Sequence, residues 1–231
     1  MQVQEQSSSR PFVLALAGGS TPKRLYQLLA ELPEGTINWS KVVLLWGDER
    51  NVPSDSEQSN FRMVRENLLD HVEIPADNIL AVPDPGGEAK TAAAEYDALL
   101  RAKIVDEYGS VNLDCALLGM GDDVHTASLF PGTTALAETE KLVVENWVEK
   151  LDCWRITLTA PTLNAASSVL FLIAGNAKQQ ALHLLWHGER DAQRYPSQLI
   201  QPASGELRFM LDEAAVGENR PPDGATLEFH S

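Results

Sequence analysis

The 231-residue sequence has few basic residues, two cysteines and no long apolar run. Its 18 Lys and Arg stand against 33 Asp and Glu, a formal net charge of −15. Nucleic acids and anionic membranes require a basic face, so neither is expected as a partner. No stretch reaches the roughly 18 apolar residues of a membrane helix, and the first ten residues lack a signal peptide's apolar core. The sequence therefore predicts a cytoplasmic protein.

The two cysteines, Cys115 and Cys153, lie in or beside apolar runs. A structural disulfide is not expected in a reducing compartment. Neither cysteine has the basic or glycine-rich surroundings that activate a thiol, so both are predicted to be inert packing residues.

Short apolar runs alternate with helical patterns along the whole chain. The runs predicted to be core strands are continuous, which is typical of parallel strands covered on both faces, and occupy 12–16, 42–46, 113–118 and 169–174. Further strands are predicted at 141–148, 155–159 and 207–211, with a weaker candidate at 78–82. Helices are predicted at 21–32, capped by Thr21, and at 60–71, 88–108 and 177–188. This order predicts one α/β domain over 1–231, with a doubly wound, mostly parallel, Rossmann-like sheet and helices on both faces.

Each core strand runs into a polar, glycine-containing segment. These segments read AGGST, GDERN, GMGDDVH and AGNAK. Ligands of open α/β sheets bind beyond the carboxyl ends of the strands, so the four loops are predicted to share one pocket.

The loop after the third core strand carries the residues best suited to chemistry. His125 follows Asp123 by two positions, and an imidazole oriented by a carboxylate can serve as a general base. Gly119 and Gly121 are candidate backbone donors to an oxyanion. A metal site formed by Asp122, Asp123 and His125 is an alternative, and so is a histidine that only caps or packs.

The other loops supply candidate anion ligands. Gly19, Ser20 and Thr21 begin a predicted helix, whose N-terminus attracts phosphate. The GDERN segment is read as a loop, in which Arg50 can bind phosphate or polarise a carbonyl, and Asp48 and Glu49 can hold a basic partner. Arg155 and Lys178 lie near strand ends, where an acidic protein needs local cations to hold an anion.

Four segments together resemble the 6-phosphogluconolactonase family. They are LAGGSTPKRLY, WGDERNVPSDSEQSNFRMVRENLL, LLGMGDDVHTASLFPGT and RITLTAPTLNAA with FLIAGNAKQQAL, and the resemblance extends over 12–215. It implies hydrolysis of 6-phosphoglucono-1,5-lactone in the oxidative pentose phosphate route, without metal or organic cofactor. Separately, we expect a monomer or a weak homo-oligomer.

The resemblance also implies roles for individual residues. His125 becomes the general base and Asp123 its orienting carboxylate. The loop of Gly19, Ser20 and Thr21, together with Arg155 and Lys178, holds the phosphate. The residues that line the sugar pocket are Asp48, Arg50 and Asn60.

The sequence departs from the family pattern in two informative places. The histidine loop usually reads Gly-Pro-Asp-Gly-His, whereas here Asp122 and Val124 replace the proline and the second glycine. A glycine there implies a positive φ, so Val124 is predicted to be strained, and Val124→Gly is predicted to raise kcat/KM. Only 11 residues precede Phe12, which predicts that the family's first strand and helix are missing and that 1–11 are disordered or partly helical.

Two other functions stay open. One is glucosamine-6-phosphate isomerase/deaminase, whose branch of the superfamily carries an acidic residue five positions after the loop histidine. Phe130 occupies that position here and cannot transfer a proton. The other is a non-catalytic phosphosugar-binding protein, although no helix-turn-helix pattern is visible.

Overall fold

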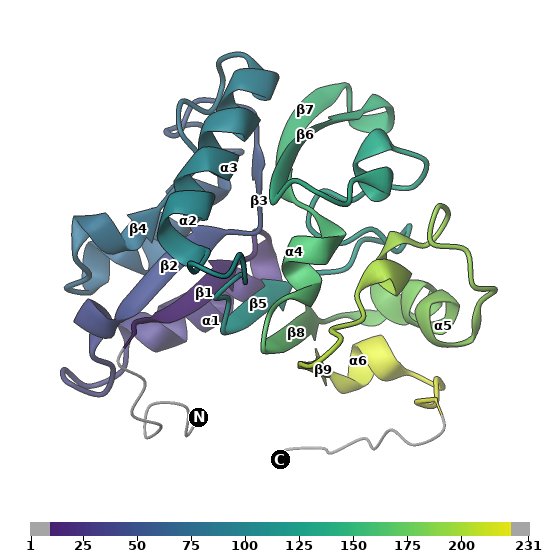
Figure 1. Cartoon of the computed structure of the whole chain (residues 1–231). Helices are drawn as coiled ribbons and strands as arrows, with labels where there is room; N and C mark the ends of the chain where they lie inside the picture. Colours follow the sequence, from purple (N-terminus) through teal and green to yellow (C-terminus); the bar gives the residue numbers. More distant parts are fainter. Residues whose placement is uncertain (1–9, 223–231) are drawn as a thin grey trace.

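The centre of the molecule is a six-stranded, entirely parallel sheet (Figure 1). The computed structural model describes residues 10–222, so the expectation for the N-terminal segment falls almost wholly outside it. The strands are β1 (Phe12–Leu16), β2 (Val42–Trp46), β4 (Ile79–Leu80), β5 (Cys115–Leu118), β8 (Ser168–Ile173) and β9 (Glu206–Leu211). Their order, β4-β2-β1-β5-β8-β9, places β1 and β5 at the centre, where the direction of winding reverses.

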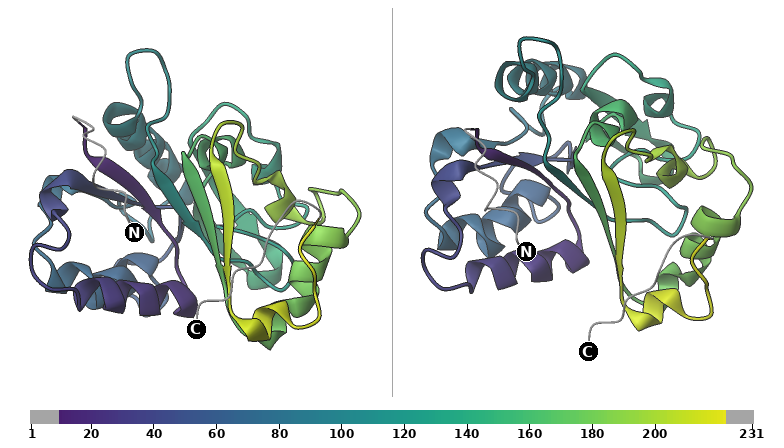
Figure 2. Two further views of the ribbon diagram at one scale, coloured as in Figure 1. Left: turned by 90° about the horizontal axis from the view of Figure 1, so that it is seen from below. Right: turned by 60° about the horizontal axis from the view of Figure 1, so that its bottom comes forward.

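Helices cover both faces of this sheet (Figure 2). Leu16 and Trp46 pack with Tyr26 of α1 (Ser20–Ala30) and Val64 of α2 (Asn60–Asn67). The opposite face packs against α3 (Ala89–Ile104), α4 (Ala160–Asn164), α5 (Gln179–His187) and α6 (Glu213–Val216). The predicted doubly wound α/β sheet is therefore confirmed.

A second, antiparallel sheet stands beside the first (Figure 1). It consists of β3 (Asp48–Arg50), β7 (Cys153–Leu158) and β6 (Val143–Val148), in that order, and α3 packs against it. The interpretation of GDERN as a loop was wrong in this respect, because Asp48–Arg50 pairs with β7. Only Gly47 separates β2 of the large sheet from β3 of the small one.

The predicted helix boundaries need corrections of a few residues. Helix α1 begins at Ser20 with Gly19 as its N-cap and no side-chain cap, so the prediction that Thr21 caps it was wrong. Gly19 has φ +103°, which suits glycine, and it makes this abrupt start possible. The short helices α4 and α6 were not predicted, since neither is long enough to give a helical period.

Short 3₁₀ turns complete the chain. They are η1 (Trp39–Lys41), η2 (Leu69–His71), η3 (Ala76–Asn78), η4 (Thr134–Ala137), η5 (Glu149–Leu151), η6 (Asn176–Lys178) and η7 (Pro196–Leu199). Within residues 10–222, none of the helices has the length and apolar character needed to cross a membrane.

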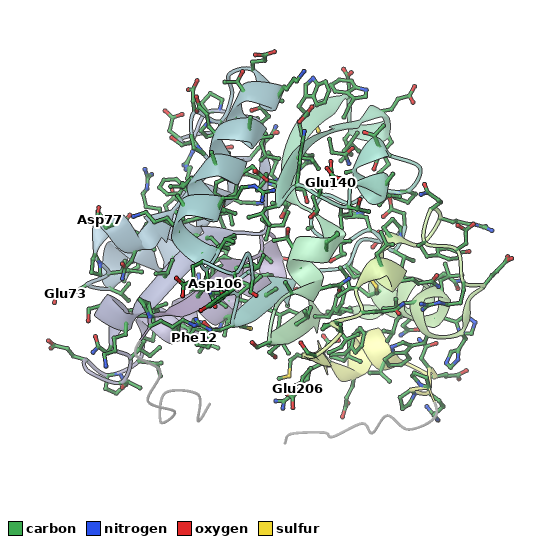
Figure 3. All side chains as sticks on the ribbon, viewed as in Figure 1. Phe12, Glu73, Asp77, Asp106, Glu140 and Glu206 are labelled. Atoms are coloured by element: carbon green, nitrogen blue, oxygen red, sulfur yellow. The ribbon has the colours of Figure 1, made fainter. Side chains whose placement is uncertain are left out.

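The parallel sheet gives the molecule two distinct edges. Phe12 and Glu206, the first residues of β1 and β9, mark the amino ends of their strands on the lower side in Figure 3. The carboxyl ends therefore lie at the opposite edge, beside the small sheet. Burial raises the pKa of the Cys115 thiol at the start of β5 to about 11, in keeping with an inert packing residue.

Candidate active site

A cavity of about 340 Å³ opens at the carboxyl ends of the central strands. The loops after β1, β2 and β5 contribute to its wall, and so does Lys178 beyond β8. The structure thus brings the four glycine-containing segments together. The polar side chains that line the cavity are those of Asp48, Arg50, Asn60, His125, Ser128, Arg155 and Lys178.

His125 and Asp123 form a short hydrogen bond at this cavity. His125 Nδ1 lies 2.5 Å from Asp123 Oδ1, and Lys150 Nζ contacts the other carboxylate oxygen. Partial burial raises the pKa of Asp123, but the hydrogen bonds from His125 and Lys150 outweigh this and hold the pKa below its ordinary value. An ionised Asp123 accepts a hydrogen bond from Nδ1–H of the imidazole, which leaves Nε2 of a neutral ring as the basic nitrogen.

The imidazole of His125 is enclosed on two further sides. The ring of Phe130 stacks on it, with centroids 4.0 Å apart and planes 24° from parallel. Gly121 lies against the ring, since a Cβ there would come within 2.0 Å of Nδ1. The glycine is therefore required for the histidine to adopt this position.

The histidine loop is closed by its own backbone. Gly121 N–H donates to His125 C=O at 2.9 Å, so the expectation that this amide serves an oxyanion was wrong. Val124 has φ +63°, which confirms the predicted left-handed conformation. The Val124 side chain is fully buried, and its carbonyl accepts hydrogen bonds from both N–H and Oγ of Ser197.

Three cations face the cavity. Arg50 on β3 lies opposite Arg155 on β7, and each has a buried Nε that finds no hydrogen-bond partner between residues 10 and 222. Lys178 Nζ contacts the carboxylate of Asp122 at 2.5 Å. The acidic chain therefore concentrates positive charge at one place, which suits a small anion.

Asp48 and Asn60 lie on the wall beside these cations. The Asp48 carboxylate accepts a hydrogen bond of 2.7 Å from Ser128 Oγ, and Asn60 Nδ2 donates to the carbonyl of Asp48 at 2.9 Å. Gly18 leaves room for Asn60, because a Cβ on Gly18 would lie 2.0 Å from Asn60 Oδ1.

Glu49, the residue between Asp48 and Arg50, points to the other side of β3. Its carboxylate accepts hydrogen bonds from the N–H groups of Asn60, Phe61 and Arg50, at 2.7 Å each. Burial raises the pKa of Glu49 and these bonds offset only part of the rise. Glu49 thus holds the start of α2, and within residues 10–222 it forms no ion pair with a basic side chain.

The predicted phosphate loop is only partly in the cavity. Gly18 and Gly19 line it, whereas Ser20 and Thr21 form the first turn of α1 and do not. Their backbone N–H groups belong to the helix start, where phosphate binding uses the main chain rather than the side chains.

The sequence alone did not indicate three residues that line the cavity, Ser128, Phe130 and Leu151, nor Lys150, which contacts Asp123. Lys150 contacts Asp123, 27 positions away in the sequence, and no local motif predicts such a contact. Phe130 was considered only as a residue that cannot carry a proton. Among residues 10–222, no three His, Cys, Asp or Glu side chains gather as metal ligands would.

The fold and the cavity define an α/β protein with a cationic ligand site at a winding reversal. The model of the glucosamine-6-phosphate isomerases/6-phosphogluconolactonase family matches residues 1–209. The chain is 46% identical to the 6-phosphogluconolactonase of Nostoc sp. over 210 residues, 90% of this chain and 84% of that protein. It is 43% identical to that of Synechocystis sp., over 90% and 85% of the two chains.

The solved 6-phosphogluconolactonase of Trypanosoma brucei superposes with a TM-score of 0.78. The two are 31% identical, over 91% of this chain and 87% of that one. The chain belongs to the glucosamine-6-phosphate isomerase/6-phosphogluconolactonase family.

Proposed function

We propose that this chain hydrolyses 6-phosphoglucono-1,5-lactone to 6-phosphogluconate in the oxidative pentose phosphate route, with His125 as general base. The observation that carries the mechanism is the Asp123–His125 pair at the wall of a cavity that also holds Arg50, Arg155 and Lys178. The curated relatives with this name support the reaction.

His125 Nε2 takes a proton from water as the water oxygen attacks the lactone carbonyl. Asp123 keeps the tautomer that leaves Nε2 basic and stabilises the imidazolium that forms. The tetrahedral intermediate then collapses, the ring C–O bond breaks, and the imidazolium returns the proton to the leaving oxygen. Water supplies the atoms added to the product, so the reaction is balanced without a cofactor.

Two of the three cations hold the phosphate, and the third holds the sugar together with neighbouring polar groups. Arg155 and Lys178, with the amides at the start of α1 around Gly19, Ser20 and Thr21, bind the phosphate. The residues assigned to the sugar are Asp48, Arg50 and Asn60. Charge-assisted hydrogen bonds of this kind contribute roughly 1.5–3 kcal/mol each.

The geometry around His125 disfavours the isomerase/deaminase alternative. Ring opening of an amino sugar phosphate requires a second acid–base group beside the histidine. Phe130 fills that place and stacks on the imidazole. We expect lactone hydrolysis above the spontaneous rate and no ammonia release from glucosamine 6-phosphate. Ammonia release that disappears in His125→Ala would reverse the assignment.

His125→Ala tests the general base directly. A positioned base contributes about 10²–10⁴-fold, so kcat is expected to fall by that factor, while calorimetric affinity for 6-phosphogluconate changes little. The matched control is His71→Ala, since His71 is the exposed last residue of η2. Wild-type kcat in His125→Ala would remove His125 from the mechanism.

The setting of the enzyme is proposed from its composition. A net charge of −15 argues against nucleic acid as a partner, and we infer a cytoplasmic monomer or weak homo-oligomer of one domain. Light scattering is expected to give the mass of a monomer or a weakly associating oligomer, and unfolding is expected to show a single cooperative transition. A stable tetramer would contradict this expectation.

A further inference from the structure

Lys150 contacts the carboxylate that holds His125, although it is not itself among the residues that line the cavity. It belongs to η5, the turn that joins β6 to β7, and its Nζ contacts Asp123 Oδ2. The same ammonium lies 5.0 Å from the ring centroid of Phe130. Its neighbour in the chain, Leu151, lines the cavity.

Lys150 therefore contacts two of the three groups that enclose His125. Asp123 holds Nδ1 by a hydrogen bond and Phe130 stacks on the ring face. The third, Gly121, lies against the ring edge. One lysine side chain thus connects the small antiparallel sheet to both groups that fix the imidazole orientation.

We propose that Lys150 is a positioning residue for His125, which occupies one oxygen of Asp123 so that the other oxygen orients the imidazole without drawing a second proton onto it. This inference deepens the proposed function, and the catalytic role of Lys150 rests on that function. The effect of Lys150 on the charge around Asp123 and His125 does not depend on it.

The electrostatic argument concerns how many cations one carboxylate faces. With Lys150 in place, the charge of Asp123 is already compensated, and an imidazolium is a second cation on the same group. Without Lys150, the full carboxylate charge stabilises the imidazolium. Lys150 thus favours the neutral imidazole, which is the form that accepts a proton from water.

The remaining charges around the cavity do not replace Lys150. Lys178 is paired with Asp122, and Glu149 and Asp152 on the turn of Lys150 are exposed. The other charged groups that line the cavity are Asp48, Arg50 and Arg155. Among these, the carboxylate of Asp48 is held by Ser128 and not by His125.

The test compares pH–rate profiles of Lys150→Met and the wild-type full-length chain. A unit charge two contacts away in a partly exposed site shifts a titration by about 0.5–1 pH unit. The acid limb of kcat/KM for 6-phosphogluconolactone is expected to move up by that amount. At pH values on this limb the variant loses roughly 3- to 10-fold, and the loss shrinks as the pH rises.

Conservative and distant variants separate charge from packing. Lys150→Arg keeps the charge and is expected to keep the acid limb at the wild-type pH, whereas Lys150→Gln repeats the shift with a different side chain. Lys90→Met, on the exposed side of α3, is the control and leaves the profile unchanged. An unshifted limb in both neutral variants, whether or not kcat falls uniformly, overturns the proposal.

A second measurement needs no turnover. The imidazole C–H signals of His125 in proton NMR, assigned with His125→Ala, are followed against pH in the wild type and in Lys150→Met. The ring is expected to take up its proton at higher pH in the variant. If the wild type fails to hydrolyse the lactone, the proposed function is wrong, yet the NMR comparison still decides whether Lys150 controls the imidazole.

Discussion

Arg50 and Arg155 lie directly opposite each other in the antiparallel pair of β3 and β7, both on the cavity wall. Like charges at opposite cross-strand positions are destabilising. Here the buried Nε of each guanidinium also finds no partner among the described residues. We expect the pair to cost stability, and under the proposed function an anionic ligand bound beside both guanidiniums relieves that cost.

The arginine pair predicts a trade-off between stability and binding. Arg155→Met removes the repulsion and one charge-assisted contact worth roughly 1.5–3 kcal/mol, so the Kd for 6-phosphogluconate is expected to rise about 10-fold or more. The Tm without ligand is expected to stay level or rise. Arg208→Met on the exposed face of β9 is the control for both. Unchanged calorimetric affinity in Arg155→Met would place the phosphate elsewhere.

Asp122 is expected to compete with the phosphate of the proposed substrate for Lys178. Its side chain is 73% exposed, and exposed ion pairs contribute about 0.2–1 kcal/mol. Asp122→Asn frees the ammonium, so we expect KM for the lactone to fall by up to about fivefold, with a smaller gain at high salt. The control Asp77→Asn changes an exposed carboxylate beside β4 (Figure 3). A higher KM would mean that Asp122 instead holds Lys178 in its binding position.

The structure changes the expectation for Val124→Gly. Relief of a left-handed valine returns roughly 1–3 kcal/mol, but the buried side chain contributes a similar amount, and the cavity and glycine entropy add to the loss. We expect a net destabilisation of about 1–2 kcal/mol and a Tm lower by roughly 2–8 °C. Since Ser197 holds the Val124 carbonyl, kcat/KM is expected to stay within about twofold of wild type. A higher Tm would show that strain dominates.

The ionisation of Asp123 is expected to account for part of the loss of folding stability at low pH. Its pKa is lower in the folded chain than in the unfolded one, so the ionised group stabilises the fold above about pH 4 and this stabilisation is lost as the pH falls below that. Asp123→Asn is expected to be less stable at pH 7 and to lose less stability than the wild type between about pH 5 and 3. Urea unfolding at each pH measures both; parallel curves for the two proteins would contradict the assignment.

The parallel sheet and its ligand edge follow from features visible in the sequence. Continuous apolar runs such as 42–46 form the buried strands, and the glycines after them meet at one edge because parallel strands share a direction. The placement of His125, Arg50 and Lys178 around one cavity follows from that rule, whereas Asn60 was assigned to the site only through the family resemblance.

The small sheet and the contact of Lys150 with Asp123 do not follow from local sequence patterns. Strand β3 is made of Asp48, Glu49 and Arg50, a charged triplet that resembles a loop until β7 pairs with it. Successive side chains of this strand face opposite sides, so that Glu49 holds α2 while Asp48 and Arg50 face the cavity. The contact of Lys150 with Asp123 depends on where η5 is carried by the two long strands, which is a tertiary property.

Gly47 is the single residue between β2 and β3, and it therefore connects two sheets that both line one cavity. Gly47 N–H donates to Leu16 C=O, and Gly47 C=O accepts from Leu158 N–H, each at 2.9 Å, so both sheets are fastened to this residue. A phosphorylated ligand that contacts Arg155 on the small sheet and the loops of the large sheet would hold the two sheets together at Gly47. Saturating ligand therefore stabilises the fold by mass action, about 2.7 kcal/mol at 100 times Kd. Ligand binding should also slow amide hydrogen exchange in β3 and β7, although these strands belong to the small sheet and not to the large sheet whose loops also contact the ligand.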